Sequence, residues 1–440
     1  MSRARFFYTL LVWVLAPLAA LYLLWRSRKQ PEYRRHWGER FGWAAYPASN
    51  RPLIWIHAVS VGETRAAQPL VAALLRAWPD HHILLTHMTP TGRETGAAIV
   101  RAHPGQVSQC YLPYDLPYAV RRFLRVTSPR LGIVMETEVW PNLLARAARQ
   151  GVTMVLANAR LSEKSLAKAL RTPNLMREAA QCFSLVLAQT AGDAGRLKAS
   201  GALNPEVVGN LKFDFTPEAA QLETGATWRE RIARPVWLFA STREGEEALI
   251  LEALSRKMQS DPDFRKSDRV LLIVPRHPQR FDEVAQLLAG TGLPVLRRSQ
   301  VGDLPAALAG TAGPVLVLGD SMGEMALYYA CADVALMGGS LLPYGSHNVI
   351  EPAAIGTPLV LGPSVYNFAQ AAEDAMAAGA ALQVEEAEAA LEAMASLSAD
   401  PARRQAMSEA GREFAAEHRG ATARTLARLA AFLPKPESLP

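Results

Sequence analysis

Carboxylate side chains follow two apolar runs in the first half of the chain, at the point where each run ends. Glu63 comes shortly after the run 53–57, and Glu136 and Glu138 follow the run 131–135. A carboxylate at the end of a buried strand can act as a general base that takes a proton from an attacking hydroxyl. An acidic residue is equally favourable near a helix N-terminus, so position alone leaves a catalytic and a capping interpretation open.

Cationic side chains that could neutralise a departing phosphate occur in both halves of the chain. Arg276, within the dipeptide Pro275-Arg276, follows the strongly apolar run 270–274. A guanidinium binds phosphate oxygens as a two-pronged donor. Lys212 lies in the segment 210–214, where the two halves meet. A single lysine is more often solvated, so its role stays open.

Two segments of the second half have features of a nucleotide pocket. The segment 319–324 follows the apolar run 315–318 and opens a helical pattern, which suits an anion bound at backbone amides. The segment 345–352 contains Asn348 and, three residues later, Glu351, which resembles a capping box. Helix entry alone would explain the same residues, so the pocket is one of two interpretations.

The segment 319–323 also matches the G-x-S-x-G nucleophile elbow of hydrolases. Asp333 and His347 follow Ser321 in the order of a hydrolase triad, but only a short way along the chain, and Asp333 stands at the start of a predicted strand. A hydrolase would leave the first half without a role, so we prefer the pocket. The chain has no P-loop, no G-x-G-x-x-G after a strand and no H-E-x-x-H motif.

Short apolar runs alternate with helical patterns and must position these residues. Continuous apolar strands joined by helices indicate parallel sheets covered on both faces, whose ligands bind beyond the carboxyl ends of the strands. The polar segment 211–234, with Pro217 and Gly225, indicates a linker between two Rossmann-like domains and predicts a site in the cleft between them. The predicted strands are 53–57, 83–86, 131–135, 154–157, 185–188, 236–240, 270–274, 315–318, 334–337 and 359–361.

The N-terminal segment Phe6–Trp25 carries no charge and is long enough to cross a hydrocarbon core. More basic residues follow it than precede it, which predicts that the chain after it lies in the cytoplasm, against anionic headgroups. Pro17 would kink a full span, so an interfacial anchor stays open. We expect an anchor at 1–30, a first Rossmann-like domain at 31–215, a linker at 216–234, a second Rossmann-like domain at 235–415 and a helical tail at 416–440.

The composition is that of a globular protein that prefers anionic partners. The 440 residues carry a net charge of +6, and 50% are hydrophobic. This balance suits phosphates, anionic lipid or nucleic acid without choosing among them. The 3 cysteines lack C-x-x-C spacing, which argues against a disulfide framework or a cysteine zinc site and favours a reducing compartment.

Taken together and in order, the motifs resemble those of the 3-deoxy-D-manno-octulosonic acid (Kdo) transferases. The resemblance runs from the anchor to about residue 370 and is far more specific than any single motif. The segments that carry it are 57–64, 87–92, 111–115, 135–141, 157–162, 211–214, 275–278, 319–324, 338–340 and 347–351.

The resemblance implies an α/β protein of the GT-B glycosyltransferase fold, with two facing Rossmann-like domains and an N-terminal membrane anchor helix. It implies inverting transfer of Kdo from CMP-Kdo to a lipid A precursor (lipid IVA) in lipopolysaccharide core biosynthesis, with release of CMP. It implies no cofactor and no catalytic metal. The expected partners are CMP-Kdo, the lipid A precursor and anionic lipids of the bacterial inner membrane, with no nucleic acid.

The same resemblance assigns roles to residues. Glu63 corresponds to the general base, and Glu136 and Lys212 to transition-state stabilisers. Arg243 stands where many members have His, which affects the substrate loops and not the chemistry. The residues that correspond to the CMP site are Pro275, Arg276, Met322, Gly323, Glu324, Asn348, Val349, Ile350 and Glu351.

Two other classes of function stay open. One is another membrane-associated GT-B transferase that uses a UDP-sugar and a lipid carrier. The other is a nucleotide-binding protein of the same fold without enzymatic activity. CMP release from CMP-Kdo but not from UDP-sugars would separate the first from the Kdo transferase, and replacement of Glu63 would separate an enzyme from a binding protein.

Overall fold

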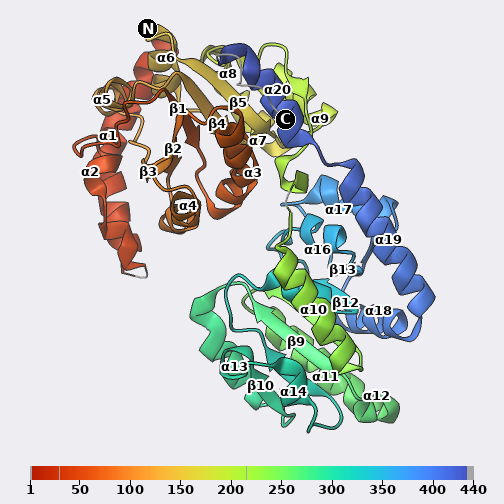
Figure 1. Ribbon diagram of the computed structural model, residues 1–440. Helices are drawn as coiled ribbons and strands as arrows, with labels where there is room; N and C mark the ends of the chain where they lie inside the picture. The colour runs from red at the N-terminus through yellow and green to blue at the C-terminus, as the bar shows by residue number, and fades with distance from the viewer. Residues whose placement is uncertain (1, 29, 215, 434–440) are drawn as a thin grey trace. The chain divides into compact units, whose positions relative to one another are not determined.

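A computed structural model describes residues 2–28, 30–214 and 216–433 (Figure 1). The expected anchor, first domain and tail also include residues 1, 29, 215 and 434–440, which lie outside the described residues. The chain divides into two compact units. Unit 1 consists of Met1–Phe215 with Arg419–Pro440, and unit 2 of Thr216–His418.

Unit 1 is built on a seven-stranded sheet in the order β3-β2-β1-β4-β5-β6-β7, in which the described neighbours are parallel. Its strands are β1 (Leu53–His57), β2 (His82–His87), β3 (Val107–Tyr111), β4 (Leu131–Met135), β5 (Thr153–Ala159), β6 (Leu185–Ala188) and β7 (Glu206–Val207). Its helices include α3 (Val61–Ala77), α4 (Pro90–Ala102), α5 (Pro117–Thr127), α6 (Pro141–Arg149), α7 (Glu163–Ala169), α8 (Pro173–Ala180) and α9 (Ala191–Ala199).

The central strand β1 explains why the strands of unit 1 are apolar throughout. Ile54 and Ile56 belong to the core on the α3 side of the sheet, whereas Trp55 belongs to the core on the α5 and α6 side. Side chains alternate between the two faces of a strand, so a strand covered on both faces is a continuous apolar run.

Unit 2 repeats this architecture with a seven-stranded sheet in the order β10-β11-β9-β8-β12-β13-β14. Its strands are β8 (Val236–Thr242), β9 (Val270–Pro275), β10 (Val295–Arg297), β11 (Val315–Leu318), β12 (Val334–Met337), β13 (Leu359–Leu361) and β14 (Ala381–Gln383). Its helices include α10 (Ala219–Ile232), α11 (Glu246–Ser260), α13 (Phe281–Ala289), α15 (Met325–Cys331), α16 (Ile350–Ile355), α18 (Ala387–Ala399) and α19 (Pro401–Glu417). The two Rossmann-like units confirm the predicted α/β class.

The segment 216–234, expected as a linker, forms the helix α10, which packs on α15. Trp228 and Ile232 are buried, with 6% and 8% of their surfaces exposed. A Cβ added at Gly225 would lie 2.5 Å from the carbonyl oxygen of Leu327. Gly225 therefore permits close approach of two helices, and its presence does not interrupt the helix.

The C-terminal helix α20 (Ala421–Leu429) packs in unit 1 on α3, although it follows unit 2 in the chain. Ala421 and Leu429 are fully buried there. The Asp214 carboxylate, at the end of the short helix η2 (Leu211–Asp214), accepts a hydrogen bond from Gly420 N at 2.6 Å. The segment that carries Lys212 is thus tied to the far end of the chain.

The N-terminal helix α1 (Arg3–Arg26) belongs to unit 1 by its contacts and is drawn in red in Figure 1. It is the one helix in the described part of the chain that is long and apolar enough to cross a membrane. Only 6% of its most apolar 18-residue window is buried within the protein. Its length and composition suit an anchor, but a membrane-spanning position does not follow from them.

Candidate active site

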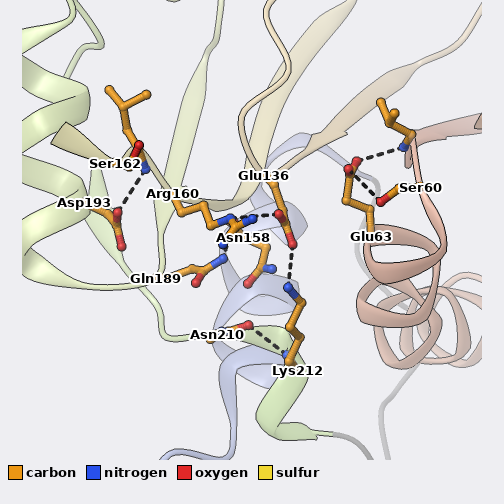
Figure 2. Close-up of polar contacts among 12 residues, drawn as sticks. Ser60, Glu63, Glu136, Asn158, Arg160, Ser162, Gln189, Asp193, Asn210 and Lys212 are labelled. Carbon is orange, nitrogen blue, oxygen red and sulfur yellow. Dashed lines mark hydrogen bonds and ion pairs between the residues drawn. The ribbon is translucent and has the colours of Figure 1, made fainter. Parts of the chain in front are cut away.

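Glu63 lies in the first turn of α3, directly beyond the carboxyl end of β1. Its Oε2 accepts a hydrogen bond from Val59 N at 2.8 Å, and its Oε1 accepts one from Ser60 Oγ at 3.2 Å (Figure 2). Burial raises the pKa of the Glu63 carboxyl to about 7. The negative charges of Glu136 and Glu138 also raise this pKa, whereas the hydrogen bonds from Val59 and Ser60 lower it. The carboxyl both caps the turn and has the pKa of a general base that works near neutral pH.

Glu136 follows β4 and has a left-handed backbone, with φ at 59°. Its Oε1 lies 2.9 Å from Lys212 Nζ, and its Oε2 accepts a hydrogen bond from Arg160 Nε at 3.0 Å (Figure 2). Burial by itself would raise the pKa of Glu136, but Lys212 and Arg160 outweigh it and the pKa is lowered. Glu136 is therefore a fixed anion that holds two cations.

Glu138 differs from Glu136 although only Thr137 separates them. The Glu138 carboxylate accepts a hydrogen bond from Trp140 Nε1 at 3.0 Å, and burial raises its pKa. In an extended strand, side chains two residues apart point the same way, but the left-handed backbone of Glu136 interrupts the extended conformation here. The pKa of Glu136 is consequently lowered, whereas that of Glu138 is raised.

Asn158 and Asn210 position the Lys212 segment, and sequence reasoning assigned neither a role. Asn158 is fully buried, with φ at 51°, and its Oδ1 accepts a hydrogen bond from Leu211 N at 2.9 Å. Lys212 N donates to Asn210 Oδ1 at 3.0 Å. The sequence feature that could have indicated the role of Asn158 is the motif 157–162, which contains Asn158 and Arg160. That motif was used only as part of the family resemblance.

The candidate nucleotide residues of unit 2 gather at one edge of its sheet. The strands β11, β9, β8 and β12 are neighbours and parallel, so their carboxyl ends meet at the same edge. The residues at or beyond these ends are Pro275 and Arg276 after β9, Met322, Gly323 and Glu324 after β11, and Asn348, Val349, Ile350 and Glu351 beyond β12.

Basic side chains lie together at this edge. Burial and the charges of Arg276, Arg243 and His277 lower the pKa of His347 to about 3. The ring is therefore neutral at physiological pH, and two guanidinium groups lie close enough to influence it. Arg276 N donates to the carbonyl of Thr242 at 2.9 Å, which fixes the backbone between β8 and β9. A cluster of this kind attracts phosphate.

The loop after β11 combines an exposed side chain with a fixed one. Met322 is 64% exposed, and Gly323 has φ at 84°, which favours glycine. The Glu324 carboxylate accepts hydrogen bonds from Arg298 Nη2 at 2.8 Å and from Ser321 Oγ. The Glu324 side chain is thus held in place within the candidate pocket.

The hydrolase interpretation fails on the positions of its three residues. Ser321 follows the carboxyl end of β11, whereas Asp333 precedes the amino end of β12, at the opposite edge of the parallel sheet. The Asp333 carboxylate accepts hydrogen bonds from Val236 N at 2.8 Å and Arg229 Nε at 3.0 Å. The charges that act on His347 are cations and do not include Asp333. Ser321, Asp333 and His347 therefore cannot form a Ser-His-Asp triad.

The capping-box expectation for Asn348 and Glu351 is also wrong. The N-cap of α16 is Val349, and its side chain makes no capping hydrogen bond. Asn348 Oδ1 accepts a hydrogen bond from Ile350 N at 3.1 Å, while Val349 and Ile350 are buried. The asparagine forms an Asx turn that precedes the helix and does not begin it.

Glu246 is a further structural residue of this edge. Its buried carboxylate accepts hydrogen bonds from Arg243 N at 2.8 Å, Gly339 N at 2.6 Å and Leu341 N at 3.0 Å. It joins the ends of β8 and β12 and so orients the loop of Arg243. Sequence reasoning could not identify it, because two of the amides belong to a distant segment.

Comparison with known proteins gives consistent results over nearly the whole chain. A family model described as 3-deoxy-D-manno-octulosonic-acid transferase (kdotransferase) matches residues 35–215. A 3-deoxy-D-manno-octulosonic acid transferase of Bordetella pertussis is 48% identical over 97% of this chain and 99% of its own length. One of Haemophilus influenzae is 36% identical over 98% of this chain and 99% of its own length.

A solved structure supports the fold alone. The UDP-GlcNAc 2-epimerase of Neisseria meningitidis superposes with a TM-score of 0.56 over 86% of this chain and 100% of its own, at 14% identity. Together with the two Rossmann-like units, this likeness confirms the predicted GT-B type of architecture.

Proposed function

The chain belongs to the 3-deoxy-D-manno-octulosonic acid (Kdo) transferase family, and from this premise we propose that it moves Kdo from CMP-Kdo to a lipid A precursor, lipid IVA, with release of CMP. The observation that carries the proposal is the Glu63 carboxyl, whose pKa is raised to about 7 beside the ion pair of Glu136 and Lys212. A base of this pKa and a fixed cation are what glycosyl transfer to an alcohol requires.

In the proposed reaction, Glu63 takes the proton of an acceptor hydroxyl while that oxygen attacks the anomeric carbon of Kdo. The bond from this carbon to the CMP phosphate oxygen breaks, and CMP leaves on the face opposite to the attack. The configuration therefore inverts. Glu63 then releases its proton to solvent before the next cycle.

Lys212 supplies positive charge to the transition state in this scheme, and Glu136 holds the lysine in place. The lowered pKa of Glu136 keeps it ionised, so Lys212 keeps a fixed position. A cation that is already oriented stabilises developing negative charge without reorganisation at the moment of reaction.

The proposed CMP site consists of the candidate residues of unit 2. Support comes from Arg276 and Arg243, whose charges both act on His347, and from Gly323, where a Cβ would meet no other atom. Open space beside a glycine allows a ligand to approach the backbone closely. The proposal involves no cofactor and no metal.

The proposed location is the cytoplasmic face of a bacterial inner membrane. Support comes from the apolar helix α1 and from the basic residues that follow it. A lipid acceptor resides in the membrane, so an anchored enzyme meets it at a high local concentration.

The test uses the purified full chain with a tetraacylated, phosphorylated glucosamine disaccharide lipid as acceptor. We expect CMP release from CMP-Kdo and an acceptor product heavier by Kdo in mass spectrometry, with no UDP release from UDP-sugars. Glu63→Gln is expected to bind CMP but to form product far more slowly than wild type. UDP release from a UDP-sugar, with none of CMP, would favour the alternative GT-B transferase and contradict the proposal.

A further inference from the structure

The first half of α1 is tied to unit 1 by polar contacts. Arg5 forms an ion pair with Glu178 of α8 at 2.8 Å, and only 8% of the arginine side chain is exposed. One helical turn later, Thr9 Oγ1 donates to Asn142 Oδ1, at the start of α6, at 2.9 Å. Arg5 and Thr9 share one face of the helix because they are four residues apart.

Tyr8 adds a contact that unit 1 itself needs. Its hydroxyl donates to Asp115 Oδ2 at 2.9 Å. Asp115 is only 2% exposed and also accepts from Asn142 N and Leu143 N at 2.9 and 2.8 Å. Removal of α1 would take one donor from a buried carboxyl group, which is unfavourable.

From Val12 onward, α1 is held by apolar contacts on the same side. The Trp13 ring stacks on Tyr118 of α5, with centroids 5.5 Å apart. Leu23 is 1% exposed and belongs to an apolar cluster of unit 1. The other buried members of this cluster are Tyr33, Phe41, Leu116 and Ala119, with Val12, Ala16 and Ala20 of α1 packed against it. Contacts with unit 1 therefore continue from Arg5 to Leu23.

The opposite face of α1 is apolar and exposed. Each of its large side chains has between 44% and 66% of its surface in solvent. Soluble monomeric proteins rarely leave so many large apolar side chains exposed along one helix. The exposed side chains of this face are Phe6, Phe7, Leu10, Leu11, Val14, Leu15, Leu18, Leu21, Tyr22, Leu24 and Trp25; Trp13, which stacks on Tyr118 on the docked face, is itself 48% exposed.

A membrane-spanning position is incompatible with the contacts on the docked face. Arg5 and Leu23 are separated by roughly 27 Å along a helix, close to the thickness of a hydrocarbon core. If α1 crossed the bilayer with these contacts kept, the surface of unit 1 between the two ends would enter the hydrocarbon, including Asn142 and the exposed Arg121, one helical turn from Tyr118 on α5. Charged groups there are strongly unfavourable.

Basic side chains lie where headgroups would be expected. Arg28, Arg34 and Arg35 follow α1 closely, and all three are exposed. Basic residues near an anionic membrane surface are attracted to its headgroups. Trp43, which is 65% exposed, adds an aromatic side chain of the kind that prefers the membrane interface.

We propose that α1 lies in the plane of the membrane as a fixed part of unit 1, with its exposed face in one leaflet of an anionic bilayer, and does not cross the bilayer. The N-terminus then lies on the same side of the membrane as unit 1. Such a helix holds unit 1 in one orientation at the surface where a lipid acceptor is presented. Only the statement about the lipid acceptor rests on the proposed function.

The first test locates the N-terminus. Cys182 is replaced by serine, because Cys110 and Cys331 are buried, and Ser2→Cys is introduced. In spheroplasts and inverted membrane vesicles, a membrane-impermeant maleimide is expected to label Ser2→Cys from the same side as Arg101→Cys, an exposed control in unit 1. Labelling of the two from opposite sides would overturn the proposal.

The second test asks whether α1 is docked in the membrane-bound enzyme. Thr9→Cys with Asn142→Cys is expected to form a disulfide on mild oxidation of membranes, since Thr9 Oγ1 lies 2.9 Å from Asn142 Oδ1 in the native protein. Leu10→Cys with Asn142→Cys is the matched control, because Leu10 belongs to the exposed face. No cross-link in the first pair, or equal cross-linking in both, would contradict docking.

The third test concerns the lipid. Binding to phosphatidylglycerol-containing vesicles is expected to exceed binding to phosphatidylcholine vesicles by roughly tenfold or more, and the triple change of Arg28, Arg34 and Arg35 to glutamine is expected to remove that preference. Equal binding would contradict an anionic partner. None of these three measurements depends on catalysis. If they support the position of α1 but the protein releases no CMP from CMP-Kdo, the proposed function is contradicted and the position of α1 is not.

Discussion

Lys212 Nζ lies 2.9 Å from Glu136 Oε1, and this ion pair joins two segments that are far apart in the chain. The glutamate side chain is 7% exposed and the lysine side chain 15% exposed. Removal of one member of such a pair leaves a poorly compensated buried charge. The relationship makes Glu136 the residue that positions Lys212, and it predicts that the two act as a unit.

Lys212→Met is expected to lower kcat for Kdo transfer by about 10²–10³-fold, because a preorganised cation is lost from the transition state. If Glu136 acts through Lys212, the double variant with Glu136→Gln will lose no more than Lys212→Met alone. Steady-state kinetics of the two single variants and the double variant measure this coupling. Lys198→Met, at an exposed position of α9, serves as the control. Losses that multiply would show that Glu136 acts independently.

Glu63→Gln is expected to lower kcat by about 10²–10⁴-fold, the range for loss of a general base, without weakening CMP binding. The same change is expected to raise the melting temperature at neutral pH, because an ionised carboxylate no longer has to be buried there. Kinetics, calorimetric CMP binding and thermal unfolding measure the three effects, with Glu94→Gln on the exposed face of α4 as the control. Near-normal turnover of Glu63→Gln would contradict its role.

The rate is expected to rise with pH through about 7, because Glu63 must be deprotonated and its pKa is raised to about 7. The effect on stability has the opposite sign. Between the ordinary value of 4.5 and about 7 the folded state retains a proton that the unfolded state has lost, so this group makes unfolding easier as pH rises. The stability advantage of Glu63→Gln should therefore grow across this window and then level off. A difference that is independent of pH would contradict the raised pKa.

The interior of both sheets could be predicted from the sequence, and the edges could not. The ten predicted strands all occur, but β3, β7, β10 and β14 were missed, and these four lie at the edges of the two sheets. Central strands are apolar on both faces and so form continuous runs. Edge strands here are short or partly polar; β7 has 2 residues and β10 and β14 have 3 each.

The candidate site was predictable where it depends on strand ends and not where it depends on long-range contacts. Glu63 and Arg276 each follow a recognisable apolar run, so their position at a sheet edge could be inferred. Asn158 and Glu246 act through backbone amides of distant segments. The raised pKa of Glu63 likewise results from tertiary burial. No local pattern encodes such contacts.

Arg276→Lys is expected to raise KM for CMP-Kdo by about 10–100-fold with a smaller effect on kcat, because lysine keeps the charge but loses the two-pronged donor. Steady-state kinetics with varied CMP-Kdo concentration measure the effects on KM and kcat separately. Arg256→Lys, at an exposed surface position, is the matched control and is expected to behave as wild type. An effect of Arg276→Lys on the lipid acceptor's KM alone would contradict the assignment of Arg276 to the donor.

Gly225→Ala tests whether the segment 216–234 is a packed helix. The added Cβ would lie 2.5 Å from the Leu327 carbonyl and 2.6 Å from the Ala330 Cβ, so α10 and α15 must separate. We expect a loss of about 1–3 kcal/mol, measured by urea unfolding. Gly195→Ala is the control, since nothing lies within 4 Å of its Cβ in α9 and alanine favours a helix by up to about 1 kcal/mol. A Gly225→Ala variant as stable as wild type would contradict the close packing of α10 on α15.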